Sequence, residues 1–418
     1  MRNRWIALVV LMLFFFPAAQ AQQQPETVLF SWFGSPALTQ ATQEGISAFV
    51  QSQRTKPVIQ YRAVENRDHY ASWLGEQWNS LNAGDLVELD AEMLRLMAKN
   101  ETGMRRLADM EMFVNQVDLS QYSYLGLVGC LVDGILCAVP VSLSSHVFFW
   151  NVTALKSLKL SPPAGEAELF AMAANLRVAG FYPLAADAQS RMAMMVTYLQ
   201  CRYGQPWVNE ETQEVSFTQA QIIEGLQYLE RLETNGVWPA LSTQGNIVAG
   251  WRAGEYLGVW AWDSLAPELD AALPDKGKME LTTHLSGWTP YGGGFQKVNR
   301  MLAIPVGARN PQISAKLIHY LLSEEKGARA LMDLRGIPIS EGGAAACRRY
   351  RLMNTAHAEA NKVALSWARY PMPTGFDAYG LVCEGGLYEQ VLVGLSEGTL
   401  TKEVSAALLI SGVKQALQ

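Results

Sequence analysis

The stretch Thr27-Val28-Leu29-Phe30-Ser31-Trp32, followed closely by Gly34-Ser35-Pro36, indicates the fold class of this chain. Its first part is an apolar run typical of a short β-strand. Ser35 is a residue type that caps helix N-termini, and Pro36 is favoured at the first helical position. Apolar side chains then recur at helical spacing: Leu38, Ala41, Ile46 and Phe49. The stretch therefore predicts a strand followed directly by a helix.

The same alternation continues downstream. Val58 to Tyr61 is typical of a second strand, and a helix is expected to carry Tyr70, Leu74, Trp78 and Leu81. Gly84-Asp85 then opens the short apolar segment 86–89. Strand, helix, strand, helix, strand predicts an α/β fold with a parallel sheet. The length implies two lobes, yet no linker is visible, so either the chain crosses several times between lobes or it forms one large domain.

Three helices stand out in the second half. Thr218 and Gln221 have the spacing of a capping box, and Gly236 is a typical stop after that helix. Asn310-Pro311 predicts the start of another helix. Ser323-Glu324-Glu325 predicts the start of a third helix, which ends near Gly336.

The N-terminal segment has the pattern of a cleavable secretory signal. Arg2 and Arg4 precede an apolar run from Trp5 to Phe16, which is shorter than the ~20 residues that a membrane-spanning helix needs. Ala19-Gln20-Ala21 is a small-x-small site, so residues 1–21 are predicted to be removed after Ala21. No cysteine lies near that site, so we expect a free periplasmic protein.

Composition and motifs exclude several functions. The net charge is −6 without basic clusters, which argues against nucleic acid and anionic lipid surfaces as partners. No nucleophile elbow, zinc-binding His-Glu-x-x-His or phosphate-binding loop is present. The five histidines are scattered singly, so we expect no metal and no cofactor.

The five cysteines allow disulfides in an oxidising compartment. Cys130 and Cys137 flank a hairpin centred on Asp133-Gly134, a strong two-residue turn. In that register the two cysteines face each other within bridging range, which predicts a Cys130–Cys137 disulfide. Cys347 and Cys383 are a weaker second pair, and buried free thiols remain an alternative for all five.

Tryptophan is the most informative residue type for function, with twelve in the chain. Aromatic planes bind the apolar face of a sugar ring, and polar side chains bind its hydroxyls. Core packing is the alternative for each of them. The tryptophans next to glycine or acidic residues at predicted strand ends are Trp32, Trp251, Trp260, Trp262 and Trp288.

Three colinear segments carry a resemblance to a known family. They are Cys137 to Asn151, which contains Pro140 and the apolar-aromatic-Asn ending; Trp251 to Trp262, which ends Gly-x-Trp-Ala-Trp; and Leu302-Ala303-Ile304-Pro305 with the helices that follow to Gly336-Ile337-Pro338. With these segments the chain resembles the extracellular solute-binding proteins of family 1, the group that contains maltose-binding protein. The resemblance covers nearly all of the chain after the signal.

The resemblance implies a two-lobed periplasmic-binding-protein type II-like fold with multiple hinge crossings. Residues 26–142 and 300–338 would form lobe 1, and residues 143–299 and 339–418 would form lobe 2. The crossings would lie near Pro140–Ser144, Gly294–Leu302 and Ile337–Gly343. A ligand would lie between the lobes, which close around it.

The resemblance also implies a set of ligand-binding residues. Trp260 matches the sugar-stacking tryptophan of the Gly-x-Trp-Ala-Trp segment. Leu89 and Ser144 stand where maltose-binding protein has a stacking tryptophan and a hinge glutamate, and Tyr379 is the nearest match for its C-terminal stacking aromatic, so maltose is not expected. The implied set is Trp32, Gly34, Ser35, Glu92, Ser144, Asp187, Gln189, Arg191, Trp260, Tyr291 and Gly292.

The resemblance therefore predicts a monomeric, non-enzymatic receptor that delivers a small solute, a sugar or oligosaccharide, to an ABC importer in the inner membrane. A periplasmic sensing subunit that presents its closed form to a membrane histidine kinase is the alternative. A hydrolase would need two carboxylates about 5–10 Å apart across a cleft, for which the sequence offers Asp187, Glu255 and Asp263.

Overall fold

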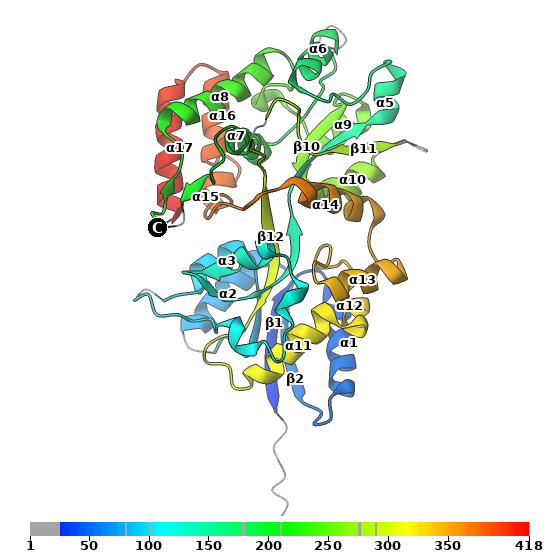
Figure 1. Cartoon of the computed structure of the whole chain (residues 1–418), viewed down its shortest axis with the longest axis vertical. Helices are drawn as coiled ribbons and strands as arrows, with labels where there is room; N and C mark the ends of the chain where they lie inside the picture. The colour runs from blue at the N-terminus through cyan, green and yellow to red at the C-terminus, as the bar shows by residue number, and fades with distance from the viewer. Residues whose placement is uncertain are drawn as a thin grey trace, which may run out of the picture.

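The computed structural model describes residues 26–79, 82–100, 102–176, 180–209, 211–274, 277–288 and 291–417, so the predicted signal segment and Leu81 lie outside the described residues. Figure 1 shows two lobes stacked along the long axis, joined in the middle by extended strands. In the described part of the chain, no helix is both long and apolar enough to cross a membrane.

Lobe 1 contains most of a six-stranded sheet in the order β13-β12-β3-β1-β2, with β6 paired to β12; the edge strand β13 lies on the lobe 2 side, where Tyr370 packs against the lobe 2 core. β1 runs parallel to both β2 and β3, as the alternating pattern predicted for these strands, whereas β12 runs antiparallel to β3 and β6, so the sheet is mixed. The six strands of this sheet are β1 (Thr27–Phe33), β2 (Val58–Val64), β3 (Leu86–Leu89), β6 (Val139–Ser144), β12 (Phe295–Ala303) and β13 (Tyr370–Pro371).

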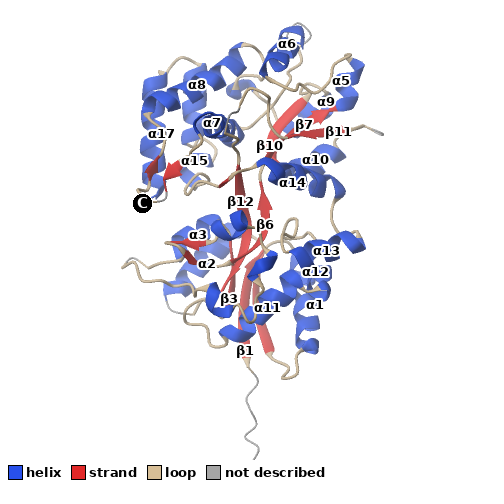
Figure 2. Ribbon diagram, viewed as in Figure 1, coloured by secondary structure: helices blue, strands red, loops and turns tan. Residues whose placement is uncertain are grey.

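Helices surround this sheet, as Figure 2 shows. Ser35 caps the first one through a 3.3 Å bond from the backbone N–H of Leu38 to Oγ, with Pro36 at the first helical position, as predicted. The helices of lobe 1 are α1 (Pro36–Ser52), α2 (Arg67–Asn79), α3 (Ala91–Met97), α4 (Tyr124–Val128), α11 (Pro311–Ser323), α12 (Glu325–Leu331) and α13 (Glu341–Tyr350).

Lobe 2 contains a small antiparallel sheet in the order β10-β7-β11, covered by helices. The capping box predicted at Thr218 and Gln221 is present at the start of α8. The elements of lobe 2 are β7 (His146–Asn151), β8 (Val208–Asn209), β9 (Glu214–Val215), β10 (Gly258–Trp262), β11 (Met279–Thr282), α5 (Val152–Ser157), α6 (Glu166–Leu176), α7 (Ala188–Tyr203), α8 (Gln219–Thr234), α9 (Ile247–Ala253), α10 (Ala266–Ala271), α14 (Thr355–Trp367), α15 (Tyr379–Val382), α16 (Leu387–Ser396) and α17 (Lys402–Leu417).

The chain passes between the lobes at β6–β7, along β12, and between α13 and α14. β6 belongs to the lobe 1 sheet and β7 to the lobe 2 sheet, with Ser145 between them. β12 pairs with β13 at Phe295 and Gln296, and its later residues pair with β3 and β6. Whether these crossings act as hinges stays a prediction.

The third crossing differs from the expectation that lobe 1 ends at Pro338. α13 packs against α11 and α12, so lobe 1 continues to Tyr350. Two glycines permit this packing, because a Cβ on Gly342 would lie 2.2 Å from the carbonyl oxygen of Ser323, and one on Gly343 would lie 2.3 Å from that of Leu322. The predicted boundary missed this close approach of backbones.

Each lobe has its own hydrophobic core. One buried cluster joins residues 28–143 with residues 298–331 of lobe 1. Two further clusters lie within residues 147–413 of lobe 2. Among the described residues, no buried cluster spans both lobes. Any space between the lobes is therefore lined by side chains from both of them.

Candidate functional site

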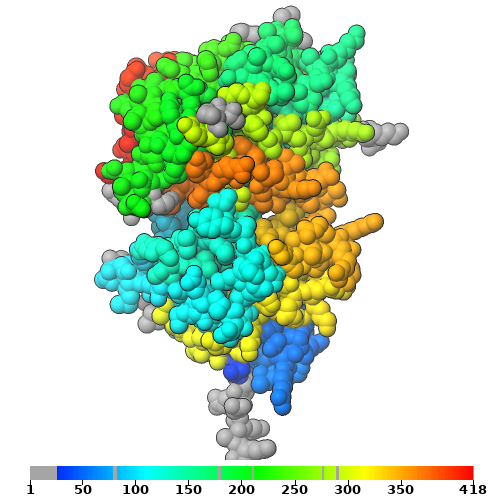
Figure 3. Space-filling view, viewed as in Figure 1, coloured from blue at the N-terminus to red at the C-terminus, as the bar shows by residue number. Residues whose placement is uncertain are grey.

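A cavity of about 870 Å³ lies beside β12, with walls from both lobes. This volume falls within the range of about 300–1,000 Å³ that is usual for small-molecule sites. Figure 1 shows α3 of lobe 1 and α15 of lobe 2 on facing sides of the junction, and both regions contribute to the walls. In the space-filling view of Figure 3, α14, in orange, lies across the seam between the lobes.

The crossing strand β12 forms part of the cavity wall. Gln296 and Val298 line the cavity, so this strand forms its wall where the two lobes meet. Gly129 also lines it, and a Cβ at that position would lie 2.5 Å from Cγ2 of Val298. Only glycine therefore allows the end of α4 to pack so closely against β12.

Two β-hairpins, one from each lobe, approach the same cavity. β4 (Leu131–Val132) and β5 (Ile135–Leu136) form the lobe 1 hairpin, whose turn residues Asp133 and Gly134 line the wall. In lobe 2, Glu211 and Gln213 lie in the turn between β8 and β9 and line it too. A movement of one lobe against the other would change the distance between these hairpins.

The first hairpin has the predicted register but not the predicted disulfide. Leu131 faces Leu136, and the N–H of Cys137 donates to the carbonyl of Cys130 at 3.0 Å. Both cysteines are free in the structure, as are Cys201, Cys347 and Cys383. The N–H of Cys130 donates to the carbonyl of Leu127 at 2.9 Å, so only one of the two ladder bonds between the cysteines is made. The structure therefore does not show the predicted Cys130–Cys137 disulfide, which stays a prediction.

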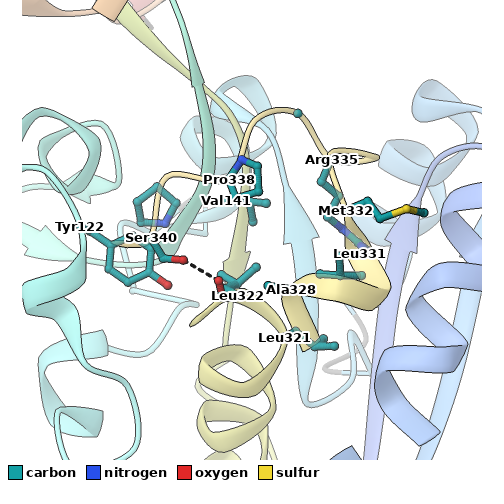
Figure 4. A pocket seen from close by; sticks show the side chains of 12 residues that line it. Tyr122, Val141, Leu321, Leu322, Ala328, Leu331, Met332, Arg335, Pro338 and Ser340 are labelled. Carbon is teal, nitrogen blue, oxygen red and sulfur yellow. Dashed lines mark hydrogen bonds between the residues drawn. The ribbon is translucent and has the colours of Figure 1, made fainter. Parts of the chain in front are cut away.

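A second cavity, of about 20 Å³, lies inside lobe 1 next to the segment 336–340. Figure 4 shows its mostly apolar lining, with Ser340 donating a hydrogen bond to the carbonyl of Leu322. The volume is about that of one water molecule. It is too small for a solute, which leaves the large cavity as the candidate site.

Among the predicted ligand-binding residues, Glu92 lines the large cavity. Its carboxylate accepts a hydrogen bond from Arg67 at 2.5 Å. Trp32 and Trp260 are fully buried in the cores of lobe 1 and lobe 2 respectively. Arg191 is buried as well, and its guanidinium donates to the carbonyls of Ala186 and Pro239. These three side chains stabilise their own lobe in this state.

Four predicted residues lie at helix N-termini outside the cavity lining. Gly34, with a φ of 139°, makes the turn from β1 into α1, and Ser35 caps that helix. Asp187 caps α7 by accepting from the N–H of Ser190 at 2.7 Å, and Gln189 lies in the first turn of the same helix. Contact of these residues with a ligand stays a prediction.

The last three predicted residues lie near the crossings. Tyr291 is exposed, and a Cβ on Gly204 would lie 2.9 Å from its ring. Gly292 adopts a left-handed conformation next to Arg369. Ser144, at the end of β6, donates to the carboxylate of Asp263. A ligand contact by Ser144 would require that bond to be exchanged.

The two tryptophans of β10 hold a buried histidine at the junction. His146 lies at the start of β7 with its ring centre 5.4 Å from that of Trp260 and 4.0 Å from that of Trp262. Burial lowers the pKa of His146 to about 3, because the imidazolium would lose its hydration there, and Lys297 adds repulsion. The histidine is therefore neutral near pH 7.

Replacing His146 with glutamine is expected to reduce the loss of stability in acid. The unfolded chain binds this proton below its ordinary pKa of 6.5, whereas the folded chain does so only near 3. Stability is therefore lost as the pH falls through this window, by up to about 1.4 kcal/mol per pH unit. Urea unfolding at about pH 7 and about pH 5 measures it, with the exposed His69→Gln as control. An unchanged pH dependence in His146→Gln would contradict the prediction.

The walls also contain residues that the sequence patterns did not single out, namely Arg95, Gln296, Thr374 and Asp377. They come from α3, β12 and the segment before α15, which are far apart in the sequence. The sequence prediction that lies nearest to these residues is the C-terminal aromatic Tyr379, which directly follows the wall residues Asp377 and Ala378. No grouping of three His, Cys, Asp or Glu side chains that could hold a metal occurs among the described residues.

Solved structures share this two-lobed architecture. A periplasmic oligogalacturonide binding protein from Yersinia enterocolitica matches with a TM-score of 0.84 at 22% identity, over 94% of this chain and 100% of that one. The GacH receptor of Streptomyces glaucescens, solved unliganded and with acarbose, matches with a TM-score of 0.70 at 16% identity, over 94% and 99%. A designed cysteine esterase matches with a TM-score of 0.85 at 20% identity, over 94% and 98%.

The sequence itself matches no protein-family model and no curated protein. The structural matches show that this chain has the α/β fold of the extracellular solute-binding proteins.

Proposed function

We propose that this chain is a periplasmic receptor that binds a carbohydrate between its two lobes and delivers it to an ABC importer in the inner membrane. The cavity of about 870 Å³ carries the proposal, because residues of both lobes and of the crossing strand β12 line it. A ligand in such a place contacts both lobes at once, so it favours the state in which they are closed.

The chemistry of the walls suits a polyhydroxylated ligand. Gln296 and Thr374 are neutral polar side chains, and Glu92 and Asp377 are carboxylates that accept hydrogen bonds from hydroxyl groups. Tyr379, exposed directly after the wall residues Asp377 and Ala378, is an aromatic ring that can stack on a sugar at the rim. The structural neighbours support the same class, since one binds oligogalacturonide and another was solved with acarbose.

We infer that the receptor binds its ligand without turnover. The three carboxylates considered for a hydrolase do not meet in the cavity: Asp187 caps α7, Glu255 is exposed before β10, and Asp263 is buried with three hydrogen-bond donors. Release of product from a bound oligosaccharide would overturn this part of the proposal. Secretion by the predicted signal and a monomeric state belong to the same proposal.

Titration of the purified protein with neutral, acidic and amino-containing oligosaccharides tests carbohydrate binding, followed by tryptophan fluorescence and calorimetry. Tyr379→Ala is expected to weaken the binding of the best ligand about 10-fold, because a stacking face is lost. Tyr124→Ala removes a similarly exposed ring from lobe 1 and serves as the matched control. The proposal fails if no saccharide binds while a peptide, polyamine or osmolyte does.

A further inference from the structure

Most of the charged side chains of the cavity wall are paired with other side chains of the protein. Glu92 pairs with Arg67 at 2.5 Å, and Asp377 pairs with Lys297 at 2.7 Å. Asp133, at the hairpin turn, forms an ion pair with Lys99, which also lines the cavity. Three of the wall carboxylates are thus already neutralised by protein cations.

Arg95 differs from these groups. It lies on α3, is half-buried and lines the cavity. Its guanidinium makes no hydrogen bond or ion pair with any residue in the described part of the chain. The nearest acid along its own helix, Glu92, sits three residues earlier and is bound by Arg67. A partly buried charge without a partner is unfavourable unless something else supplies the opposite charge.

We propose that Arg95 binds a carboxylate of the ligand, so that the receptor selects acidic saccharides such as those built from uronic acids. This rests on the proposed function above. The planar fork of a guanidinium matches the two oxygens of a carboxylate and binds them in bidentate fashion. Because Arg95 is half-buried, the pair would be screened less by salt than a fully exposed pair. The hydroxyl groups of the sugar rings would form hydrogen bonds with the carboxylates and amides elsewhere in the cavity wall.

Glu211 is the competing partner. It lines the cavity from lobe 2, is exposed, and makes no ion pair with another described residue. If closure of the lobes brings Glu211 to Arg95, the two form an ion pair that stabilises the closed state, and the arginine does not contact the ligand. Glu211 is exposed to water and needs no partner, whereas Arg95 is half-buried. We therefore assign Arg95 to the ligand.

Calorimetric titration of the full chain with digalacturonate and with a neutral disaccharide of the same length tests the assignment. We expect digalacturonate to bind more tightly, and Arg95→Gln to weaken its binding about 10- to 100-fold while leaving the neutral sugar unchanged. Arg95→Lys should lose part of this affinity, because an ammonium cannot form the fork. The exposed Arg252→Gln in lobe 2 is the matched charge control.

Three outcomes overturn the inference. The first is equal binding of the acidic and neutral disaccharides, with Arg95→Gln without effect; carbohydrate binding, and with it the proposed function, would then stand. The second is equal weakening of both sugars by Arg95→Gln and by Glu211→Gln, which would assign Arg95 to lobe closure. The third is no binding of either sugar together with binding of a non-carbohydrate solute, which would overturn the proposed function as well.

Discussion

Replacing Glu88 with alanine is expected to lower the free energy of unfolding by about 3–5 kcal/mol. Glu88 lies on β3 and is completely buried. One carboxylate oxygen accepts from Arg300, and the other accepts from Nε of Arg335 at 2.8 Å. Arg335 is itself buried, and its Nη1 donates to Thr42 at 2.9 Å. Without the carboxylate, this buried guanidinium would have no counter-ion.

Urea unfolding followed by circular dichroism measures this effect as a shift in the midpoint at constant slope. The exposed Glu65→Ala, at the turn after β2, is the matched control because it removes the same side chain from the surface. Glu88→Gln should recover part of the stability, since an amide oxygen can still accept one of the two bonds. A midpoint for Glu88→Ala no lower than that of Glu65→Ala would refute the role of this buried network.

Replacing Asp263 with alanine is expected to lower the free energy of unfolding by about 3 kcal/mol. The carboxylate of Asp263 is buried at the end of β10. It accepts from Oγ of Ser144, from the N–H of Ser145 at 3.3 Å and from Nδ2 of Asn361 at 2.5 Å. His357 lies 3.9 Å away on α14. The residue therefore joins the first crossing, the lobe 2 sheet and α14.

Asparagine distinguishes the hydrogen-bonding role of Asp263 from a packing role. The amide has the shape of the carboxylate, but its NH2 group would face the Nδ2 group of Asn361, which is also a donor. We therefore expect Asp263→Asn to recover less than half of the loss seen with alanine. Thermal and urea unfolding measure both variants, with the exposed Asp270→Ala as control. Full recovery by asparagine would show that only the volume of the side chain matters.

Burial also affects the protonation of Asp263. Desolvation raises the pKa of this carboxyl, while the bonds from Ser144 and Asn361 act in the opposite direction. A raised pKa means that the charged carboxylate is less favoured in the folded state than in the unfolded chain. The hydrogen bonds at the crossing are what keep this group compatible with its buried position.

Local sequence signals predicted the elements of this protein well. β1 and β3 were expected within one residue of their observed ends, and the caps at Ser35 and Thr218 are present. These features depend on neighbours in the sequence: alternation of strands with amphipathic helices, and side chains that bind nearby backbone N–H groups. The hairpin at Asp133-Gly134 belongs to the same class, because its turn is set by two residues.

The candidate site was much less predictable. Trp260 matched the family position for sugar stacking, yet its ring is fully buried between His146 and neighbouring aromatic side chains of lobe 2. The wall residues Arg95 and Asp377 belong to no recognisable sequence motif. Each lines the cavity only because segments that are distant in the sequence pack around the same space. Glu92 was predicted through the family resemblance, and the cavity does include it.

The sequence by itself therefore determined the α/β class, the main strands and helices, and the hairpin register. Only the tertiary structure decided that α13 packs on lobe 1, which side chains line the cavity, and which of their charges remain unpaired. The physical reason is that strand and helix formation depends on patterns within about ten residues. Burial, ion pairing and the shape of a cavity depend on which distant segments meet, and here β12 brings together residues from both halves of the chain.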